Sequence, residues 1–402
     1  MRIACVYIPS FPLQVALVGH STGVASLAVV AQPAIGSPVV VACSRVAWQH
    51  GVRPGASATV ARAHDPEIQC VLADVAAERA LLRSVADALL GVAPRVELGG
   101  EPRGQHHVMY AEVPAGKRGS WFGNKVRDLL ALFGLRGRIG IADDRFTAYV
   151  AAASGARDDD DAVVCVPRGG SAAYLAPQPL ALLQLGPEVL HMLEALGVRT
   201  LGAFAELPPP SVMRPDPDGW DADFQALARG DGGAELDAYS PGGPIAERAV
   251  IDGAGAEASV GAAVETLSQR LAARLAGRMG QGPTVELMLR LTGASPVPAI
   301  RALQLPHADA DNLADAIGRA LGGDSWTAIE AIARPESMGP VVAVPATAAA
   351  VRHEIEPIAP LVLLPSPTGY GRGGDRVEHR RTRRGKQRPR IGAGQARLFA
   401  GD

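Results

Sequence analysis

The sequence predicts a chain of several domains, of the mixed α/β and α+β classes, that ends in a disordered tail. Its 402 residues are enough for two or more domains with hydrophobic cores. Hydrophobic residues make up 48% of the chain, more than a disordered protein contains. Apolar strand-like runs alternate with amphipathic helical stretches over the first third, whereas periodicity is lost from about Pro345 onward.

The first third reads as an alternation of strands and helices. The opening run Arg2–Ile8 is rich in Ile and Val and stops at Pro9, as a buried strand does. Leucines recur at helical spacing in Ala76–Leu90. The same patterns predict further strands at Val39–Ala42, Val96–Leu98, His107–Val113 and Arg138–Ile141, and helices at Val126–Leu135 and Phe146–Ala153.

The middle of the chain reads as a helical hairpin. An amphipathic helix at Pro187–Leu196 is followed by a turn with Gly197 and Gly202, and then by a helix at Ala203–Leu207. A last helical turn is expected at Phe224–Gly230.

A new unit begins near Glu247. Its patterns predict the order strand, helix, strand, strand, helix, strand, a compact α+β sandwich. The ranges are Glu247–Asp252, Val260–Met279, Thr284–Leu291, Ala299–Leu305, Ala308–Leu321 and Ala328–Ala333. In the long helix Arg270, Arg274 and Arg278 share one face. Such a row tracks a phosphate backbone or forms an ordinary solvated face, and spacing alone does not choose.

The tail concentrates positive charge. Residues 371–390 hold nine Lys or Arg against two acidic residues, although the whole chain carries −2. Nucleic-acid binding must therefore depend on local patches. The basic stretch Arg380–Lys386 either holds DNA without sequence preference or serves as a solubilising linker.

Cysteine usage and hydropathy predict a cytoplasmic protein, and no cofactor is expected. Four cysteines are far apart in the sequence, which favours buried thiols in a reducing compartment. The N-terminus reads as a strand and not as a signal peptide, and the apolar runs are too short to span a membrane.

Five segments stand in a fixed order along the chain: Val6–Val15, Ala42–Arg45 with Gly51–Gly55, Gly140–Phe146, Leu185–Gly202, and Leu227–Gly230. In this order they resemble segments of Y-family (UmuC/DinB-type) translesion DNA polymerases, and among these the catalytically inactive ImuB-like branch of bacterial mutagenesis cassettes. The strand–helix unit after Glu247 is similar to the family's little finger. The resemblance covers about residues 1–345.

The resemblance implies a domain layout. It places a palm at residues 1–10 and 70–170, fingers at 11–69, a thumb with a helix-hairpin-helix at 175–235, a little finger at 245–345, and a flexible basic tail at 346–402.

The resemblance also implies that the metal-binding carboxylates of the family are replaced. They fall on Tyr7 and on His107-Val108, or on His106-His107 with a one-residue slip. Mg²⁺ needs hard oxygen ligands, and a phenol with a pKa near ~10 is not one at neutral pH. The triphosphate-gripping positions fall on Arg45, Trp48 and Tyr149. We therefore expect a protein that is not an enzyme and binds no metal.

Other metal-ligand candidates are unfavourable by geometry. His106 and His107 are adjacent on a strand, so they point to opposite faces. Asp143-Asp144 stands before a helix, where carboxylates usually cap. The acidic run Asp158–Asp161 reads as a solvated loop.

Two regions are expected to contact partners. The thumb resemblance predicts contact with the DNA backbone through Gly197, Arg199, Thr200 and Gly202, joined by Arg270 and Arg274 of the little finger. The tail peptide Gln395–Phe399 resembles the motif by which bacterial repair polymerases dock on the sliding clamp, with Gln395, Leu398 and Phe399 as contacts. The other interpretation of this peptide is a chance tail sequence.

The sequence thus predicts a DNA-binding scaffold without catalysis in SOS-induced translesion synthesis. By resemblance it would recruit an error-prone replicative-type polymerase and a RecA-like accessory protein. One alternative is an active polymerase with metal ligands relocated among Glu97, Glu101, Glu112, Asp143 and Asp144. Another is a degenerate remnant that does not contact the clamp.

Overall fold

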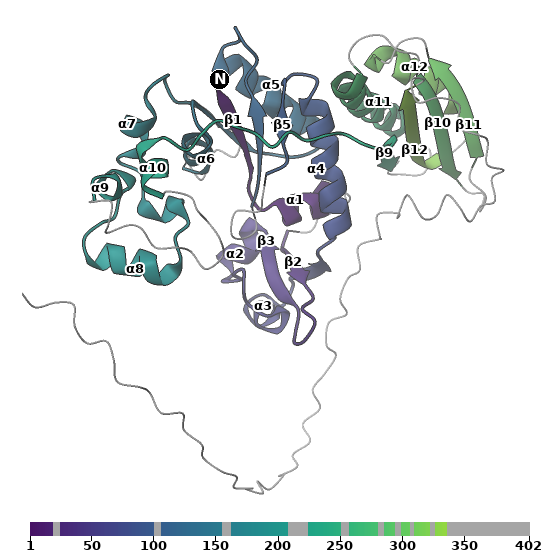
Figure 1. Ribbon diagram of the computed structural model, residues 1–402. Helices are drawn as coiled ribbons and strands as arrows, with labels where there is room; N and C mark the ends of the chain where they lie inside the picture. Colours follow the sequence, from purple (N-terminus) through teal and green to yellow (C-terminus); the bar gives the residue numbers. More distant parts are fainter. Residues whose placement is uncertain are drawn as a thin grey trace, which may run out of the picture. The chain divides into compact units, whose positions relative to one another are not determined.

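The structure is a computed structural model (Figure 1). It describes residues 1–18, 25–99, 106–154, 162–207, 224–250, 257–279, 285–293, 299–305, 309–321 and 326–335. The chain divides into two compact units, residues 1–364 and 365–402, and every described residue belongs to the first. Glu101, the run Asp158–Asp161 and the whole tail, with Gln395, Leu398 and Phe399, lie outside the described residues.

A five-stranded sheet has β1 at its centre, in the order β5-β6-β1-β7-β8. β1 pairs antiparallel with β6 and β7, and β8 pairs parallel with β7. The strands are β1 (Ile3–Ile8), β5 (Val96–Glu97), β6 (His107–Glu112), β7 (Arg138–Ala142) and β8 (Val163–Cys165). Every residue of β1 is buried, as its unbroken apolar run predicts.

Helices pack on both faces of this sheet. Helices α4 (Val75–Leu89) and α5 (Gly119–Leu132) cover the face that carries Ala4, Val6 and Ile8 of β1. Helix α6 (Arg145–Ala153) packs on the opposite face, with Tyr7. Figure 1 shows α6 on one side of β1, with α4 and α5 on the other. The alternation of side chains along β1 thus sorts its residues into two cores.

Glycines set how closely two of these helices approach the sheet. A Cβ at Gly140 would lie 2.1 Å from the carbonyl oxygen of Ala148 in α6, so only glycine allows this contact. A Cβ at Gly123 would lie 2.3 Å from Val163 of β8. Helix α5 begins seven residues before Val126, the predicted start. Gly119 and Gly123 favour a loop in the sequence, but in the structure they belong to the helix and face the sheet.

A three-stranded sheet in the order β3-β2-β4 forms a separate small core. Its strands are β2 (Leu27–Ala31), β3 (Val39–Cys43) and β4 (Gln69–Leu72). The helices of this part are α1 (Phe11–Val18), α2 (Arg45–Gln49) and α3 (Ala58–His64). Ser44 and Ser57 cap the first turns of α2 and α3 through their side chains.

The predicted helical hairpin lies in a cluster of short helices. These are α7 (Ser171–Leu175), the 3₁₀ helix η1 (Leu180–Leu183), α8 (Pro187–Ala195), α9 (Leu201–Ala205) and α10 (Phe224–Arg229). Leu175, Leu201 and Phe204 form their core together with Val150 of α6.

A four-stranded sheet in the order β11-β10-β12-β9 follows. Its elements are β9 (Ile245–Val250), α11 (Glu257–Met279), β10 (Val285–Gly293), β11 (Ala299–Leu305), α12 (Ala310–Leu321) and β12 (Trp326–Pro335), in the predicted order. Both helices pack on one face, where Leu271, Leu289 and Ile317 share a core.

Helix α11 also packs against α4 of the five-stranded sheet part. Gly91 of the five-stranded sheet part and Gly277 of α11 face each other there. A Cβ built at Gly277 would lie 1.7 Å from the carbonyl oxygen of Asp87, and a Cβ built at Gly91 would lie 3.3 Å from the Gly277 nitrogen. The Asp87 carboxylate accepts hydrogen bonds from Arg274, Arg278 and the Tyr239 hydroxyl. This contact is therefore close-packed and charged.

Cys5, Cys43 and Cys70 are buried, as expected, whereas Cys165 at the end of the edge strand β8 is exposed. Among the described helices, none combines the length and the apolar character that crossing a membrane requires.

Candidate functional site

Tyr7 and His107-Val108, the positions on which the resemblance places metal carboxylates, lie on the paired strands β1 and β6 of the five-stranded sheet. Tyr7 of β1 pairs in register with Val108 of β6 and with Arg138 of β7. Tyr7 is only 6% exposed. Tyr7 and Val108, two positions on which the resemblance places family carboxylates, are thus neighbours across paired strands.

An aromatic and cationic cluster surrounds Tyr7. The Arg138 guanidinium carbon lies 4.8 Å from the centroid of the Tyr7 ring. The ring centroids of His106 and Tyr149 lie 5.2 Å and 6.4 Å from that of Tyr7. The Gln184 side chain donates a hydrogen bond of 2.7 Å to the Tyr149 hydroxyl.

The electrostatics of this cluster follow from burial. Burial raises the pKa of Tyr7 to about 12, although the nearby Arg138 charge opposes the shift. Burial also raises the pKa of Tyr149, and burial together with Arg138 lowers the pKa of His106. The neutral His106 ring accepts a hydrogen bond at Nδ1 from the Ser10 amide, at 3.1 Å. At neutral pH the two phenols and the imidazole are therefore uncharged.

His106 and His107 point to opposite faces of β6, as the strand alternation predicts. The His107 ring packs 5.4 Å from that of Phe11, and its Nε2 lies 3.1 Å from the carbonyl oxygen of Leu98. The two rings therefore do not converge on one ion.

The four alternative carboxylates that the structure describes are engaged elsewhere. Glu97 pairs with Arg145 and accepts the Asp237 amide at 2.8 Å. The other pairs are Glu112 with Arg95, Asp143 with Arg2 and the Gly169 amide, and Asp144 with the Thr147 amide and the Ser171 hydroxyl. Asp144 caps α6, as predicted. Within the described part of the chain, no three His, Cys, Asp or Glu side chains gather as a metal site would require.

The predicted nucleotide-binding positions come from two parts of the molecule. Arg45 and Trp48 are exposed on α2, whereas Tyr149 lies on α6 beside Tyr7. Trp48 stacks with Arg53, a partner the sequence analysis did not consider.

The thumb residues predicted to meet DNA have distinct local roles. Gly197 ends α8 with a φ of 86°, and nothing lies within 4 Å of a Cβ built there. Thr200 caps α9 by accepting the Ala203 amide, next to the exposed Arg199. A Cβ built at Gly202 would lie 2.9 Å from the carbonyl oxygen of Ala176, so this glycine allows the close contact after α7. Gly197 and Arg199 thus keep an open surface.

Arg270 and Arg274 lie against the five-stranded sheet part and not on an open face. The Arg274 side chain is 6% exposed and bonds Asp87 at 2.9 Å and Glu247 at 2.6 Å. Arg270 donates to the carbonyl oxygen of Leu132 at 2.8 Å. In this arrangement neither the phosphate-tracking row nor the solvated face is formed, because Asp87 of α4 and Leu132 of α5, together with Glu247 of β9, accept hydrogen bonds from these arginines.

Sequence reasoning missed the second face of the four-stranded sheet. Along β10 the residues alternate, so that Leu287 and Leu289 are buried while Glu286 and Arg290 are exposed. Arg290 lies opposite Ile300, which is 67% exposed, and 3.7 Å from Glu330 of β12. The alternation of β10 itself was the signal that marks this face.

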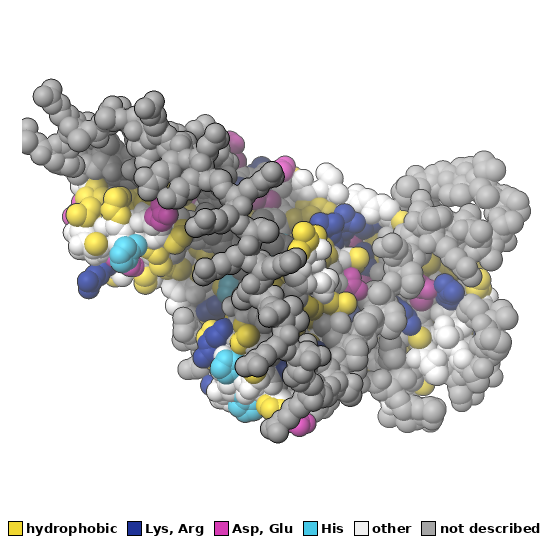
Figure 2. All heavy atoms as spheres, turned by 90° about the horizontal axis from the view of Figure 1, so that it is seen from below, with side chains coloured by type: hydrophobic (Ala, Val, Ile, Leu, Met, Phe, Trp, Pro, Cys, Tyr) yellow, Lys and Arg dark blue, Asp and Glu magenta, His cyan; other side chains and the backbone are white. Residues whose placement is uncertain are grey.

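On the part of the face that is left uncovered in Figure 2, Lys and Arg side chains lie among hydrophobic and acidic ones. This matches the small net charge of −2.

No protein-family model matches the chain, and no curated protein matches its sequence. Solved structures do match. DinB from Sulfolobus solfataricus aligns with a TM-score of 0.50 and 14% identity, over 83% of this chain and 99% of that one. An insertion ternary complex of Dbh DNA polymerase aligns with a TM-score of 0.51 and 13% identity, over the same shares. A post-insertion binary complex of that polymerase gives a TM-score of 0.51 and 14% identity, over 83% and 98%.

The chain therefore has a mixed α/β fold like that of Y-family DNA polymerases over 83% of its length. The same matches overturn the prediction that the chain is not an enzyme, because the proteins that share its fold are DNA polymerases. That prediction depended on a few aligned positions. At 14% identity most aligned side chains differ between this chain and DinB, although the two share a fold.

Proposed function

We propose that the chain is a polymerase-like protein of translesion synthesis that binds primer–template DNA without reading its sequence. The observation that carries the proposal is the fold. It is shared over 83% of this chain, over 99% of the polymerase chain in the insertion complex and over 98% of that in the post-insertion complex. A match of this extent includes the parts on both sides of the five-stranded sheet and not an isolated domain.

Two exposed surfaces supply suitable contacts. At the helical hairpin the open turn at Gly197 stands beside the exposed Arg199. On the four-stranded sheet the exposed face carries Arg290, whose side chain is 54% exposed. Arginines and open backbone suit contacts with phosphates, which fix position without reading bases.

Binding of a fluorescent primer–template by the full chain tests this proposal. We expect affinity to fall at least about tenfold between ~50 and ~200 mM salt, because phosphate contacts release counterions. Arg199→Ala and Arg290→Ala should each weaken binding and reduce the salt slope by about one. The matched control is Arg127→Ala, an exposed arginine paired with its neighbour Asp128. Full affinity of the Arg199→Ala/Arg290→Ala double variant would refute the proposed surfaces.

We also propose that the tail docks on the sliding clamp of DNA replication during SOS mutagenesis. Gln395, Leu398 and Phe399 supply a polar contact and two adjacent apolar anchors in a polar segment. Clamp capture by the wild type and loss of capture by Leu398→Ala/Phe399→Ala is the expected result. Equal capture of the wild type and the double variant would refute the proposed clamp docking. The error-prone replicative-type polymerase and the RecA-like accessory protein stay predictions.

Nucleotide transfer is a second candidate function, favoured by the polymerase fold of the neighbours. Primer extension with Mg²⁺ or Mn²⁺ tests it. Asp143→Asn and Glu97→Gln test relocated ligands with little change in volume. Asp144→Ala is not a suitable test, because losing the α6 cap and the hydrogen bond to Ser171 would disturb the fold as well. Absence of extension with either metal would remove this candidate.

A further inference from the structure

Trp48 is a large aromatic side chain left exposed at the last turn of α2. It is 46% exposed. Single exposed hydrophobic residues are common on protein surfaces, so exposure alone is not a site. What distinguishes Trp48 is that its partner and the backbone around it are held in place.

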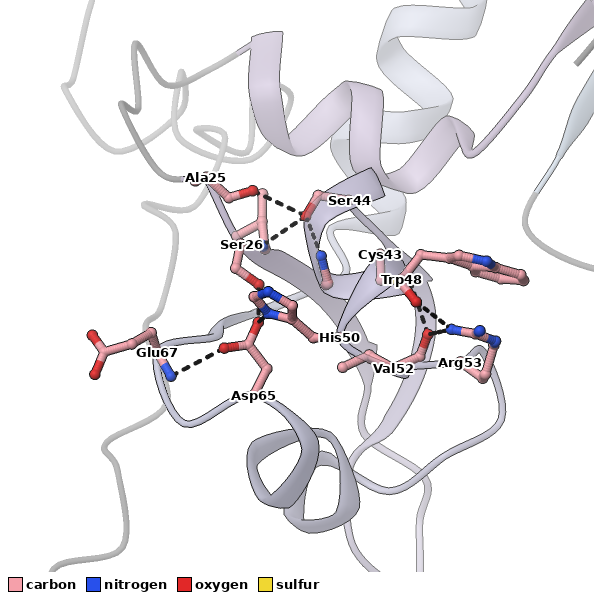
Figure 3. A network of polar contacts seen from close by, with 12 residues as sticks. Ala25, Ser26, Cys43, Ser44, Trp48, His50, Val52, Arg53, Asp65 and Glu67 are labelled. Carbon is pink, nitrogen blue, oxygen red and sulfur yellow. Dashed lines mark hydrogen bonds and ion pairs between the residues drawn. The ribbon is translucent and has the colours of Figure 1, made fainter. Parts of the chain in front are cut away.

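Arg53 is stacked on the indole and fixed there. Its guanidinium carbon lies 4.0 Å from the centroid of the Trp48 ring. Its Nη1 donates to the carbonyl oxygens of Trp48, at 2.6 Å, and Val52, at 2.8 Å. In Figure 3 the side chains of Trp48 and Arg53 lie one over the other and are directed away from Asp65. The two carbonyls thus hold the guanidinium in its stacked position.

The turn beneath the stack is closed by a short network (Figure 3). Ser44 caps α2 through the Ala47 amide at 3.3 Å and also accepts the Leu27 amide at 3.1 Å. The Val52 amide donates to the carbonyl of Ala47 at 3.0 Å, around Gly51 with its φ of 96°. The indole therefore projects from a braced turn.

A buried carboxylate braces the other side of the same turn. Asp65 is 3% exposed and accepts hydrogen bonds from the Ser26 hydroxyl, from the Glu67 amide at 3.2 Å, and from His50, whose Nδ1 lies 2.9 Å away. Burial by itself raises the pKa of Asp65, but these hydrogen bonds outweigh it and lower the pKa. His50 is thereby tied to β2 and to the segment before β4.

An indole with a fixed guanidinium offers a π-face and a positive charge together. Unpaired nucleobases stack on aromatic and arginine planes, and the adjoining phosphate is attracted by the cation. The exposed Arg45 stands on the same short helix. Bases inside a duplex are already stacked on both faces, so the matching ligand is single-stranded DNA.

We propose that Trp48 and Arg53 form a stacking platform for an unpaired base of single-stranded DNA beside the primer–template junction. The inference rests on the proposed function and specifies the part of the DNA that this surface holds.

Equilibrium binding of two fluorescent DNAs tests the platform in the full chain. One is a primer–template with a single-stranded 5′ overhang, and the other is a blunt duplex of the same length. We expect Trp48→Ala to weaken binding of the overhang DNA by about tenfold or more and to leave blunt-duplex binding unchanged. Trp48→Phe keeps an aromatic face and should retain most of the affinity.

Trp121 provides the matched control. It lies on α5, is 41% exposed, and has the Lys117 ammonium 4.9 Å from its ring centroid. Trp121→Ala should bind both DNAs as the wild type does, and equal thermal midpoints of the two variants should show that folding is kept.

The outcomes separate the two claims. Wild-type affinity of Trp48→Ala for the overhang DNA overturns the platform while DNA binding stands, and leaves a protein partner as the occupant. Equal losses on overhang and blunt DNA, or equal losses in Trp48→Ala and Trp121→Ala, also overturn it. If the wild type binds neither DNA, the proposed function itself fails.

Discussion

Tyr7 is a phenol at the middle of the five-stranded sheet, where the sequence resemblance expects a carboxylate. Its ring lies under Arg138 and beside His106. The phenol is protonated at neutral pH, and burial raises its pKa to about 12. An aspartate here would instead be a buried charge beside Arg138, and the surrounding rings offer it little solvation. The centre thus packs uncharged rings around the Arg138 guanidinium.

Tyr7 should make the fold sensitive to alkaline pH. A phenol with a raised folded-state pKa contributes stability below its unfolded value of about 10, and that stability is lost as the pH rises to about 12. At ~1.4 kcal/mol per pKa unit the loss is on the order of 2 kcal/mol. Urea unfolding at pH 9 and 11.5 should show a larger loss for the wild type than for Tyr7→Phe.

The control is a tyrosinate absorbance titration of both proteins in denaturant, where every phenol titrates near its ordinary ~10. In the folded state the difference between the two titrations should emerge above pH 11. An alkaline loss of stability that is the same in both proteins would contradict the assignment.

The contact between α6 and β7 depends on Gly140, because the residue has no Cβ. A Cβ there would meet backbone atoms of Ala148 at 2.1 Å and Ala152 at 2.5 Å. We expect Gly140→Ala to lower the free energy of unfolding by roughly 1–3 kcal/mol, as overpacking does. Gly318→Ala in α12 is the control, since nothing lies within 4 Å of its Cβ position.

Gly318→Ala should instead stabilise the chain by up to about 1 kcal/mol, because alanine favours helix. Urea unfolding of both variants measures the contrast. A Gly140→Ala variant as stable as the wild type would show that α6 does not pack as described.

The contact between α4 and α11 depends on Asp87. This carboxylate is fully buried and holds Arg274 at 2.9 Å and Arg278 at 2.8 Å. Asp87→Ala removes the carboxylate that Arg274 and Arg278 share, and breaking a buried pair costs roughly 3–5 kcal/mol. Thermal unfolding measures the loss. The control Asp128→Ala removes an exposed partner, and we expect a change below about 1 kcal/mol. Equal midpoints for the two variants would count against this contact.

Periodicity predicts local elements well and their mutual contacts poorly. The strand run Ala299–Leu305 is predicted to the residue, and β9 to β12 with both helices follow the predicted order. Strands β2, β4 and β8 are missed, because short apolar runs of three to five residues are ambiguous. The burial of Arg274 could not be foreseen, since Asp87 is 187 residues away in sequence.

The candidate site is predictable to a similar degree. The opposite orientations of His106 and His107 and the cap by Asp144 follow from strand alternation and helix capping. The neighbours Arg138 and Tyr149 around Tyr7 depend on strand order and on the packing of α6, which a single sequence does not encode locally. The stack of Arg53 on Trp48 depends on turn geometry in the same way.

For the whole molecule, the shared fold raises the question of which part of the chain holds DNA. The described domains carry exposed arginines at Arg199 and Arg290, whereas residues 371–390 carry nine basic residues in the tail. Either source would give salt-dependent binding. We propose that the described domains, and not the tail, hold the DNA.

Amide hydrogen exchange of the full chain, with and without primer–template DNA, tests that assignment most directly. We predict new protection in the helical hairpin, residues 187–207, and in β10 and β11, with α12 unchanged as an internal control. Protection confined to the tail, with the hairpin and the four-stranded sheet exchanging as in the free protein, would contradict the account.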